Sequence, residues 1–202
     1  MIYHLDELFI CRCLKMTLLS KPYKITFQLV GSYLQQLYLN PIRTKSITAC
    51  IIATLGNYTA QKCAGVKVIN QDTLCAFGIF GLLFGGTIPH YFYEILSRIV
   101  NEESKFAPFQ MLLLERFIFM PLYSFFSLYM ISRLEGKTHR ESMSHVSRIY
   151  FPVVEANVKY LTLLNYLNLN FVPPMLRVLV ANIIGFFWVV YLAGKRARAA
   201  KK

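Results

Sequence analysis

The chain has 202 residues, of which 55% are hydrophobic and only 16% charged, and its formal net charge is +12. Soluble domains normally carry about a quarter of charged residues, so this deficit disfavours a soluble protein and favours one that lies in lipid. The cations do not indicate nucleic-acid binding, because Lys and Arg cluster at the ends of apolar runs. That pattern is typical of charges that flank membrane spans and meet anionic headgroups.

No catalytic or metal chemistry is visible in the sequence. The five cysteines contain no Cys-x-x-Cys pair and the four histidines are scattered, so neither a disulfide framework nor a zinc site is indicated. Asp72, Glu94 and Glu115 fall on different predicted elements, and no glycine-rich phosphate loop is present. We therefore expect a protein that is not an enzyme and that holds no metal or cofactor.

Residues 1–29 form a basic and apolar extension. Asp6 and Glu7 precede its apolar patch, which fits neither a secretory signal nor an acid-poor mitochondrial presequence. We expect the targeting signal, or address, to be internal to the sequence. We also expect residues 25–42 to form an amphipathic segment. The best candidate address is the stretch through Lys45, whose cations alternate with apolar residues: Arg12, Lys15, Lys21, Lys24, Arg43 and Lys45.

The first predicted span covers about residues 45–61 and carries a polar stripe. Thr54, Asn57 and Gln61 fall on one helical face together with Cys50. Such a stripe is costly in lipid unless it faces other helices or water. Two interpretations stay open: hydrogen bonding between helices without further function, and the lining of a water-filled pore.

The second predicted span, about residues 73–96, is marked by small residues. Gly78, Gly81 and Gly85 share a face, and the last two make a Gly-x-x-x-Gly step. Small residues at this spacing let the backbones of membrane helices approach closely, within one chain or between chains. Pro89 is expected to kink or end this span.

The third predicted span, about residues 110–132, contains the adjacent Glu115 and Arg116, followed by Pro121. Two charges inside an apolar run should be buried against partners or water. Since adjacent residues point about 100° apart on a helix, we expect one to pair with another helix and the other to lie near a membrane face.

The segment between the third and fourth spans is too polar to cross a membrane, and residues 140–160 are expected to lie on its surface, broken near Pro152. The fourth predicted span runs from Pro174 to about residue 193, followed by a basic tail over 194–202. The sequence therefore predicts an all-α integral membrane protein, with a domain of about four transmembrane helices over residues 30–193. Four spans put both ends of this domain on one side, and the basic termini favour the cytosol, although the basic third loop conflicts with that orientation.

The order of motifs resembles the family of small membrane proteins typified by Mpv-seventeen and peroxisomal membrane protein two. The resemblance covers about residues 30–193 and is carried by Tyr33, Leu37, Pro41, Thr44, Gly56, Asn57, His90, Tyr93, Glu115, Arg116, Pro121, Asn170, Pro173, Arg177 and Trp188. Gly56-Asn57 and the run from Leu134 to Lys137 are similar to the peroxisomal branch. Thr87, where the family usually has proline, marks a divergent member.

The resemblance implies a multi-pass protein of the peroxisomal membrane that acts as a channel for small water-soluble metabolites. Thr54, Asn57, Gln61, Glu115 and Arg116 are the predicted pore-lining residues. The alternatives are a non-conducting membrane scaffold or assembly protein and a mitochondrial inner-membrane relative. The expected partners are the lipid bilayer, small solutes, further copies of the chain and a receptor for membrane-protein import, and not nucleic acid.

Overall fold

The computed structural model describes residues 21–100 and 106–199, and within these residues it is all-helical. The chain forms two compact units, Met1–Leu39 and Asn40–Lys202. The described part of the first unit is one helix, α2 (Lys21–Leu39). The predicted address falls partly outside the described residues, since Arg12 and Lys15 precede α2.

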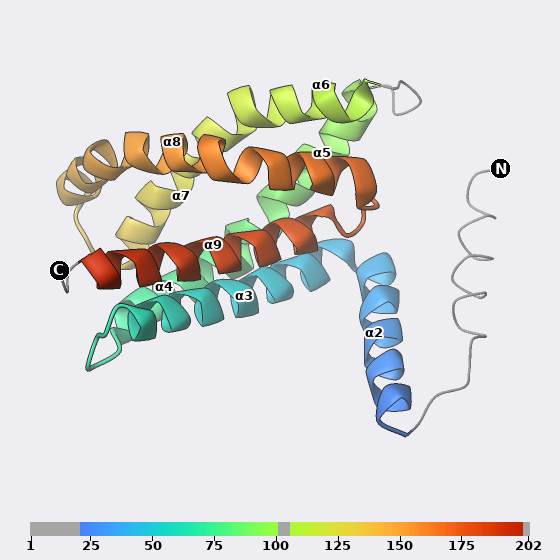
Figure 1. Ribbon diagram of the computed structural model, residues 1–202, viewed down its shortest axis with the longest axis horizontal. Coiled ribbons are helices and arrows are strands. Elements are labelled where there is room, and N and C mark those ends of the chain that lie inside the picture. The colour runs from blue at the N-terminus through green and yellow to red at the C-terminus, as the bar shows by residue number, and fades with distance from the viewer. Residues whose placement is uncertain (1–20, 101–105, 200–202) are drawn as a thin grey trace. The chain divides into compact units, whose positions relative to one another are not determined.

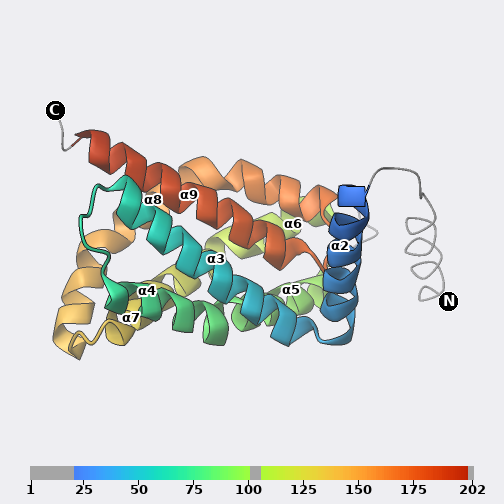
Figure 2. The same cartoon turned by 90° about the horizontal axis from the view of Figure 1, so that it is seen from below.

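The second unit is a bundle in which each helical stretch packs beside the preceding one and runs back along it (Figures 1 and 2). It begins with α3 (Pro41–Cys63). The second stretch consists of α4 (Gln71–Phe80), the π-helix η1 (Gly81–Gly85) and α5 (Thr87–Ile99). The third consists of α6 (Ala107–Leu114), the π-helix η2 (Glu115–Phe119) and α7 (Met120–Leu134). It ends with α8 (His139–Phe171) and α9 (Arg177–Ala199).

Local sequence explains where several of these helices begin and end. The side chain of Asn70 accepts from the backbone N–H of Thr73 at 3.1 Å and caps α4. Thr138 and Glu141 form a reciprocal capping box at the start of α8. Gly65 and Gly136 follow α3 and α7 with φ of 76° and 84°, a conformation that glycine adopts without steric cost.

The second and the third helical stretch each contain a π-helical turn shortly before a proline. Pro89 and Pro121 lack the N–H that would bond to the carbonyl four residues earlier, so the preceding turn is loosened. The helix does not end at Pro89 but continues to Ile99. A π-helical turn also shifts the register of the side chains that follow it.

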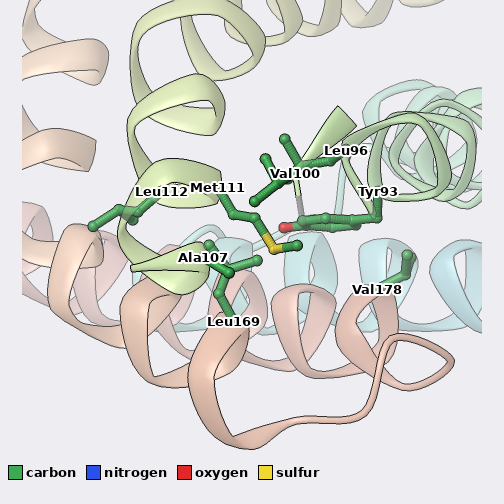
Figure 3. Packing of buried hydrophobic residues seen from close by; sticks show 8 residues of the cluster. All are labelled: Tyr93, Leu96, Val100, Ala107, Met111, Leu112, Leu169 and Val178. Carbon is green, nitrogen blue, oxygen red and sulfur yellow. The ribbon is translucent and has the colours of Figure 1, made fainter. Parts of the chain in front are cut away.

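A cluster of buried apolar residues lies where α5, α6, α8 and α9 meet. Figure 3 shows its members, with Met111 reaching between the helices toward Tyr93. Burial of these apolar side chains stabilises this end of the bundle. The members of the cluster are Tyr93, Leu96, Val100, Ala107, Met111, Leu112, Leu169 and Val178.

Two described helical stretches are long and apolar enough to cross a membrane, Gln71–Ile99 and Ala107–Leu134, and Arg177–Val190 is a shorter apolar helix. The fourth predicted span begins at Arg177 rather than at Pro174, because Pro173 to Leu176 form a turn in which the Leu176 N–H donates to the Pro173 carbonyl at 2.9 Å.

The expected break near Pro152 is wrong. Residues 139–171 form one helix with Pro152 inside it, about 50 Å long at 1.5 Å per residue. Because α8 lies beside α7 and then α6, it carries the chain back along the bundle. The start of α3 and the end of α9 consequently lie at opposite ends of the second unit, in contrast to the arrangement that the four-span count implies (Figures 1 and 2).

Candidate functional site: a polar cavity inside the bundle

A cavity of about 370 Å³ lies inside the second unit, between helices from α3 to α9. Most of its wall is apolar, with aromatic rings from α4, η2 and α7. Its polar wall consists mainly of amides and hydroxyls with one carboxylate: Asn57, Glu115, Tyr123, Ser124, Ser127, Asn157, Asn165 and Asn182.

The polar stripe of α3 is divided between this cavity and helix contacts. Asn57 is buried and lines the cavity, and its Oδ1 accepts from Gln61 Nε2 at 2.8 Å. Gln61 turns to the loop before α4, where it binds the backbone of Asn70. Thr54 lies against Gly78, since a Cβ on that glycine would come within 2.8 Å of Thr54 Oγ1. Of these three predicted pore-lining residues, the structure places Asn57 in the cavity wall.

Glu115 and Arg116 are both buried, and the expectation that only one of them pairs with another helix is wrong. Arg116 Nε is 2.9 Å from Glu115 Oε2, and both side chains also bind α8. Arg116 Nη1 donates to Asn157 Oδ1 at 2.6 Å, and Asn165 Nδ2 donates to Glu115 Oε1 at 3.0 Å. The two residues begin η2, whose wider turn brings successive side chains closer in angle than an α-helix does. Glu115 lines the cavity, whereas Arg116 lies behind it.

Two partners of this ion pair, Asn157 and Asn165, belong to a second polar stripe that the sequence prediction missed. Asn157, Asn165 and Asn168 fall at i, i+8 and i+11 with Leu161 between them, so they share one face of α8. The same periodicity that revealed the stripe of α3 would have found this one. The predicted surface segment over residues 140–160 divides this helix in two and so hides the stripe.

Hydrogen bonds of Arg177 connect the start of α9 to the end of α8. Its Nε donates to the Val172 carbonyl and its Nη2 to the Leu169 carbonyl, each at 3.3 Å, and its own carbonyl accepts from Asn168 Nδ2 at 3.1 Å. A buried guanidinium here satisfies carbonyls that the end of a helix leaves without intrahelical partners. The charge predicted near the start of the fourth span therefore has a structural role in the bundle.

The glycines of α4 and η1 face α3 within the same chain. A Cβ on Gly81 would lie 2.7 Å from the Ala49 carbonyl oxygen, and one on Gly85 would lie 3.3 Å from Ala49 Cβ. The closest approach is at Gly86, where a Cβ would lie 2.4 Å from the backbone N of Ser46. This approach lets two polar pairs form nearby, Lys45 Nζ with His90 Nδ1 at 3.0 Å and Ser46 Oγ with Thr87 Oγ1 at 3.2 Å.

The other residues of the predicted motif lie around the bundle. The Thr44 hydroxyl donates to the Asn40 carbonyl next to Pro41, and the Pro121 carbonyl accepts from the Tyr150 hydroxyl at 3.3 Å. The ring of Trp188 lies 5.2 Å from that of Tyr160, joining α9 to α8. Gly56 faces Phe186, Tyr93 is in the core, and Asn170 and Pro173 are exposed at the end of α8.

One buried amide in the cavity wall has an unused donor. Asn182 Nδ2 is buried and makes no hydrogen bond to any of the residues that the structure describes. A buried donor without a partner costs roughly 1–3 kcal/mol, so an occupant that accepts a hydrogen bond there would recover part of that cost. Over residues 21–100 and 106–199, no group of His, Cys, Asp and Glu side chains is arranged to hold a metal ion. The cavity therefore offers hydrogen bonding to a guest.

Two apolar helical stretches of membrane-spanning length, packed in a helical bundle whose mostly apolar cavity carries several amides, are typical of a helical membrane protein. A profile of the Mpv17 / PMP22 family matches residues 132–193. The chain is 30% identical over 178 residues to PXMP2/4 family protein 3 of Dictyostelium discoideum, covering 86% of this chain and 94% of that one. The chain belongs to the Mpv17 / PMP22 family.

Relatives in two different membranes are similar to this chain. Peroxisomal membrane protein 2 of Bos taurus is 29% identical over 173 residues, covering 81% of this chain and 87% of that one. The mitochondrial inner membrane protein Mpv17 of Caenorhabditis briggsae is 21% identical over 155 residues, with 77% and 86% covered. No solved structure matches the chain.

Proposed function

We propose that this protein lies in the peroxisomal membrane and lets small water-soluble solutes pass along the cavity of its second unit. The observation that carries the proposal is the cavity wall, in which Asn57, Asn165 and Asn182 present amides inside a bundle of membrane helices. A polar group facing hydrocarbon is costly, so amides retained in such an interior favour a role with water or solute. The similarity to the bovine peroxisomal membrane protein 2 supports this localisation.

The cavity wall suits solutes that carry no charge or whose charges cancel. At roughly 30 Å³ per water molecule, about 370 Å³ holds on the order of a dozen waters or one small organic molecule. The carboxylate of Glu115 is compensated by Arg116, so its field inside the cavity is weak. Amides can donate and accept, which lets them replace the hydration shell of a passing solute.

In this proposal four helical stretches cross the membrane: α3, α4 to α5, α6 to α7, and α9. The polar helix α8 returns the chain between the third and the fourth. Glu155 and Lys159 are exposed near the middle of α8, where contact with hydrocarbon would be costly. We infer that further copies of the chain or water cover this side, which favours a homo-oligomer. Nothing in this proposed role requires a catalytic step, a cofactor or nucleic acid.

A second candidate is a non-conducting membrane scaffold or assembly protein. It is favoured by the interhelical contacts that Gln61 and Arg116 make, since these residues stabilise the bundle whether or not solute passes. In that case the cavity is a packing defect that holds water.

Flux through liposomes separates the two candidates. The purified protein, reconstituted at equal density, should release small polar solutes, and the double variant Asn57→Leu/Asn182→Leu should reduce the rate several-fold by making the wall apolar. Thr59→Leu on the exposed side of α3 is the matched control, and planar-bilayer conductance is the independent check. Equal flux from a well-inserted double variant would reject the cavity as the path and favour the scaffold.

Localisation tests the address separately. A fluorescent fusion of the full-length chain should coincide with a peroxisomal marker, and changing the six cations from Arg12 to Lys45 to glutamine should scatter it if an import receptor recognises them. Mitochondrial localisation would place the protein with the mitochondrial inner-membrane relatives and leave its membrane class intact.

A further inference from the structure

A hollow of about 520 Å³ lies on the surface where α8 begins, and its wall is strongly basic. We call it the cationic hollow, and it is lined by Lys137, Arg140, Glu141, Ser144, His145 and Arg148. It shares no lining residue with the central cavity, and the proposed passage of solutes does not require it.

The one acid in the cationic hollow is already engaged. Glu141 Oε2 accepts from the backbone N–H and from the hydroxyl of Thr138, each at 2.8 Å, as part of the capping box. Lys137 pairs with Glu135 at 2.7 Å. Among the described residues, no carboxylate lies within ion-pair distance of Arg140, His145 or Arg148. The hollow therefore presents cations that an anion can bind.

An apolar surface continues from the cationic hollow along the same helix. Arg140, Ser144 and Arg148 are spaced at i, i+4 and i+8, and Phe151 is the next residue on that face, with 75% of its surface exposed. Tyr150 packs edge-on against Phe125 of α7, which is itself 42% exposed. The surface thus changes from basic to aromatic over about two helical turns.

The end of the bundle that carries the hollow is basic as a whole. Both views place the α3–α4 turn, the α7–α8 turn and the end of α9 at this end of the second unit (Figures 1 and 2). Lys62 and Arg133 lie in the last turns of α3 and α7, and Lys67 lies in the turn after α3. The end of α9 includes Lys195, Arg196 and Arg198 in sequence. The hollow also follows directly after the candidate span Ala107–Leu134, which puts it at the depth of lipid headgroups.

We propose that the cationic hollow binds an anionic phospholipid, with the headgroup phosphate between Arg140, Ser144 and Arg148 and the acyl chains along Phe151 and Phe125. Guanidinium groups pair with phosphate in a bidentate manner, and the serine hydroxyl adds a donor. A soluble anion would use only the basic part of the surface, whereas a phospholipid uses both parts. This inference does not depend on whether the protein conducts.

The test measures binding to the purified full-length protein in detergent by native mass spectrometry. The probes are a short-chain phosphatidylinositol phosphate, a short-chain phosphatidylcholine and the inositol phosphate headgroup without chains. The phosphatidylinositol phosphate should bind more tightly than both other probes, and its affinity should fall with added salt.

Matched variants assign the site. Arg140→Gln/Arg148→Gln should weaken binding of the phosphatidylinositol phosphate roughly 30-fold, at about tenfold or less for each cation. Arg43→Gln/Arg98→Gln removes the same charge from exposed positions elsewhere and should change it by less than about twofold. Phe151→Ser should weaken binding of the lipid but not of the headgroup. Ser144→Glu adds a charge to the same face that repels the phosphate. This variant should also weaken binding of the phosphatidylinositol phosphate, and it replaces the double variant if that protein is unstable.

Three results would overturn the proposal. Equal weakening by the two double variants would mean that net charge alone attracts the lipid. Equal affinity for phosphatidylcholine would remove the role of the cations. Equal affinity for the headgroup without chains would assign the hollow to a soluble phosphate.

Discussion

Gln61 binds both backbone groups of Asn70. Its Oε1 accepts from the Asn70 N–H at 2.7 Å, and its Nε2 lies 3.2 Å from the Asn70 carbonyl oxygen. The side chain that a hydropathy argument assigns to a pore thus closes the hairpin between α3 and α4.

Gln61→Leu should therefore act on stability rather than on flux. The change removes the acceptor of the exposed Asn70 N–H and should lower the free energy of unfolding by roughly 0.5–1.5 kcal/mol. Thermal unfolding in detergent measures the loss, with Thr59→Leu as the control. Flux per inserted molecule should stay near that of the unchanged protein, and a selective loss of flux at full stability would return Gln61 to the pore wall.

The buried pair of Glu115 and Arg116 should behave as a unit. Arg116→Leu leaves a carboxylate buried without its cation, which should cost roughly 3–5 kcal/mol. Adding Glu115→Gln should recover much of that loss, because a neutral amide at this position can still bond with Asn165. A double-mutant cycle on thermal unfolding gives the coupling energy. Additive losses would mean that the two charges act independently.

The effect of adding a methyl group can be compared between a tightly packed glycine of the second helical stretch and an unhindered glycine of α9. Gly86→Ala should strongly destabilise the bundle, since the new Cβ would meet the backbone of Ser46 at 2.4 Å and that backbone cannot easily move. Gly185→Ala is the control, because nothing lies within 4 Å of its Cβ and the substitution favours a helix by up to about 1 kcal/mol. The midpoints of thermal unfolding should move in opposite directions. Similar midpoints would show that α3 and η1 separate readily.

The course of α8 predicts which loops share a side of the membrane. If α8 crosses with the bundle, protease-sensitive tags in the α7–α8 turn and after α9 should be cut from the same side, and a tag in the α5–α6 turn from the other. Protease protection on isolated organelles reads this directly. Tags in the α7–α8 turn and after α9 that are cut from opposite sides would mean that α8 lies on the membrane surface.

The capping box of α8 should make stability depend on pH. Hydrogen bonds from the backbone and hydroxyl of Thr138 hold the pKa of Glu141 below its ordinary value. Because the pKa is lower in the folded state, the carboxylate stabilises the protein above its unfolded pKa of about 4.3, and this contribution is lost as pH falls through the folded pKa.

The comparison of the unchanged protein with Glu141→Gln isolates this effect. At about pH 6 the unchanged protein should have the higher midpoint of thermal unfolding, and the difference should shrink toward about pH 3. Glutamine can still serve in a capping box, so the helix start is kept in both proteins. A difference that does not change with pH would show that Glu141 carries no folding-linked proton uptake.

Much of the helical architecture could be predicted from the sequence, because apolar stretches have boundary signals, such as Pro41 at the start of α3 and Gly136 after α7. The contacts of Glu115 and Arg116 could not. A 100° helix places these residues on different faces, whereas in the structure both begin the π-helical turn that follows Leu114 and both bind α8. For α8 itself, Pro152 suggested two segments, but packing against α7 and α6 holds one helix through the proline.

The site was predicted in part for a related reason. Periodicity shows which residues of one helix share a face, and that information correctly groups Thr54, Asn57 and Gln61. It does not show which neighbour each residue meets at a given depth. Only Asn57 reaches the cavity, since the α3–α4 hairpin closes over Gln61 and Gly78 covers Thr54.

The packing of α9 against α3 has a consequence for biosynthesis. The first and the last helix of the second unit are neighbours, although more than a hundred residues separate them in sequence (Figures 1 and 2). The ribosome synthesises α9 more than a hundred residues after α3, so one side of α3 has no native neighbour until α9 has emerged. Contacts between such distant segments form late and leave apolar surface open to aggregation meanwhile. The nascent chain should therefore need a chaperone that shields α3, and truncation before α9 should leave the earlier helices as a substrate for quality control.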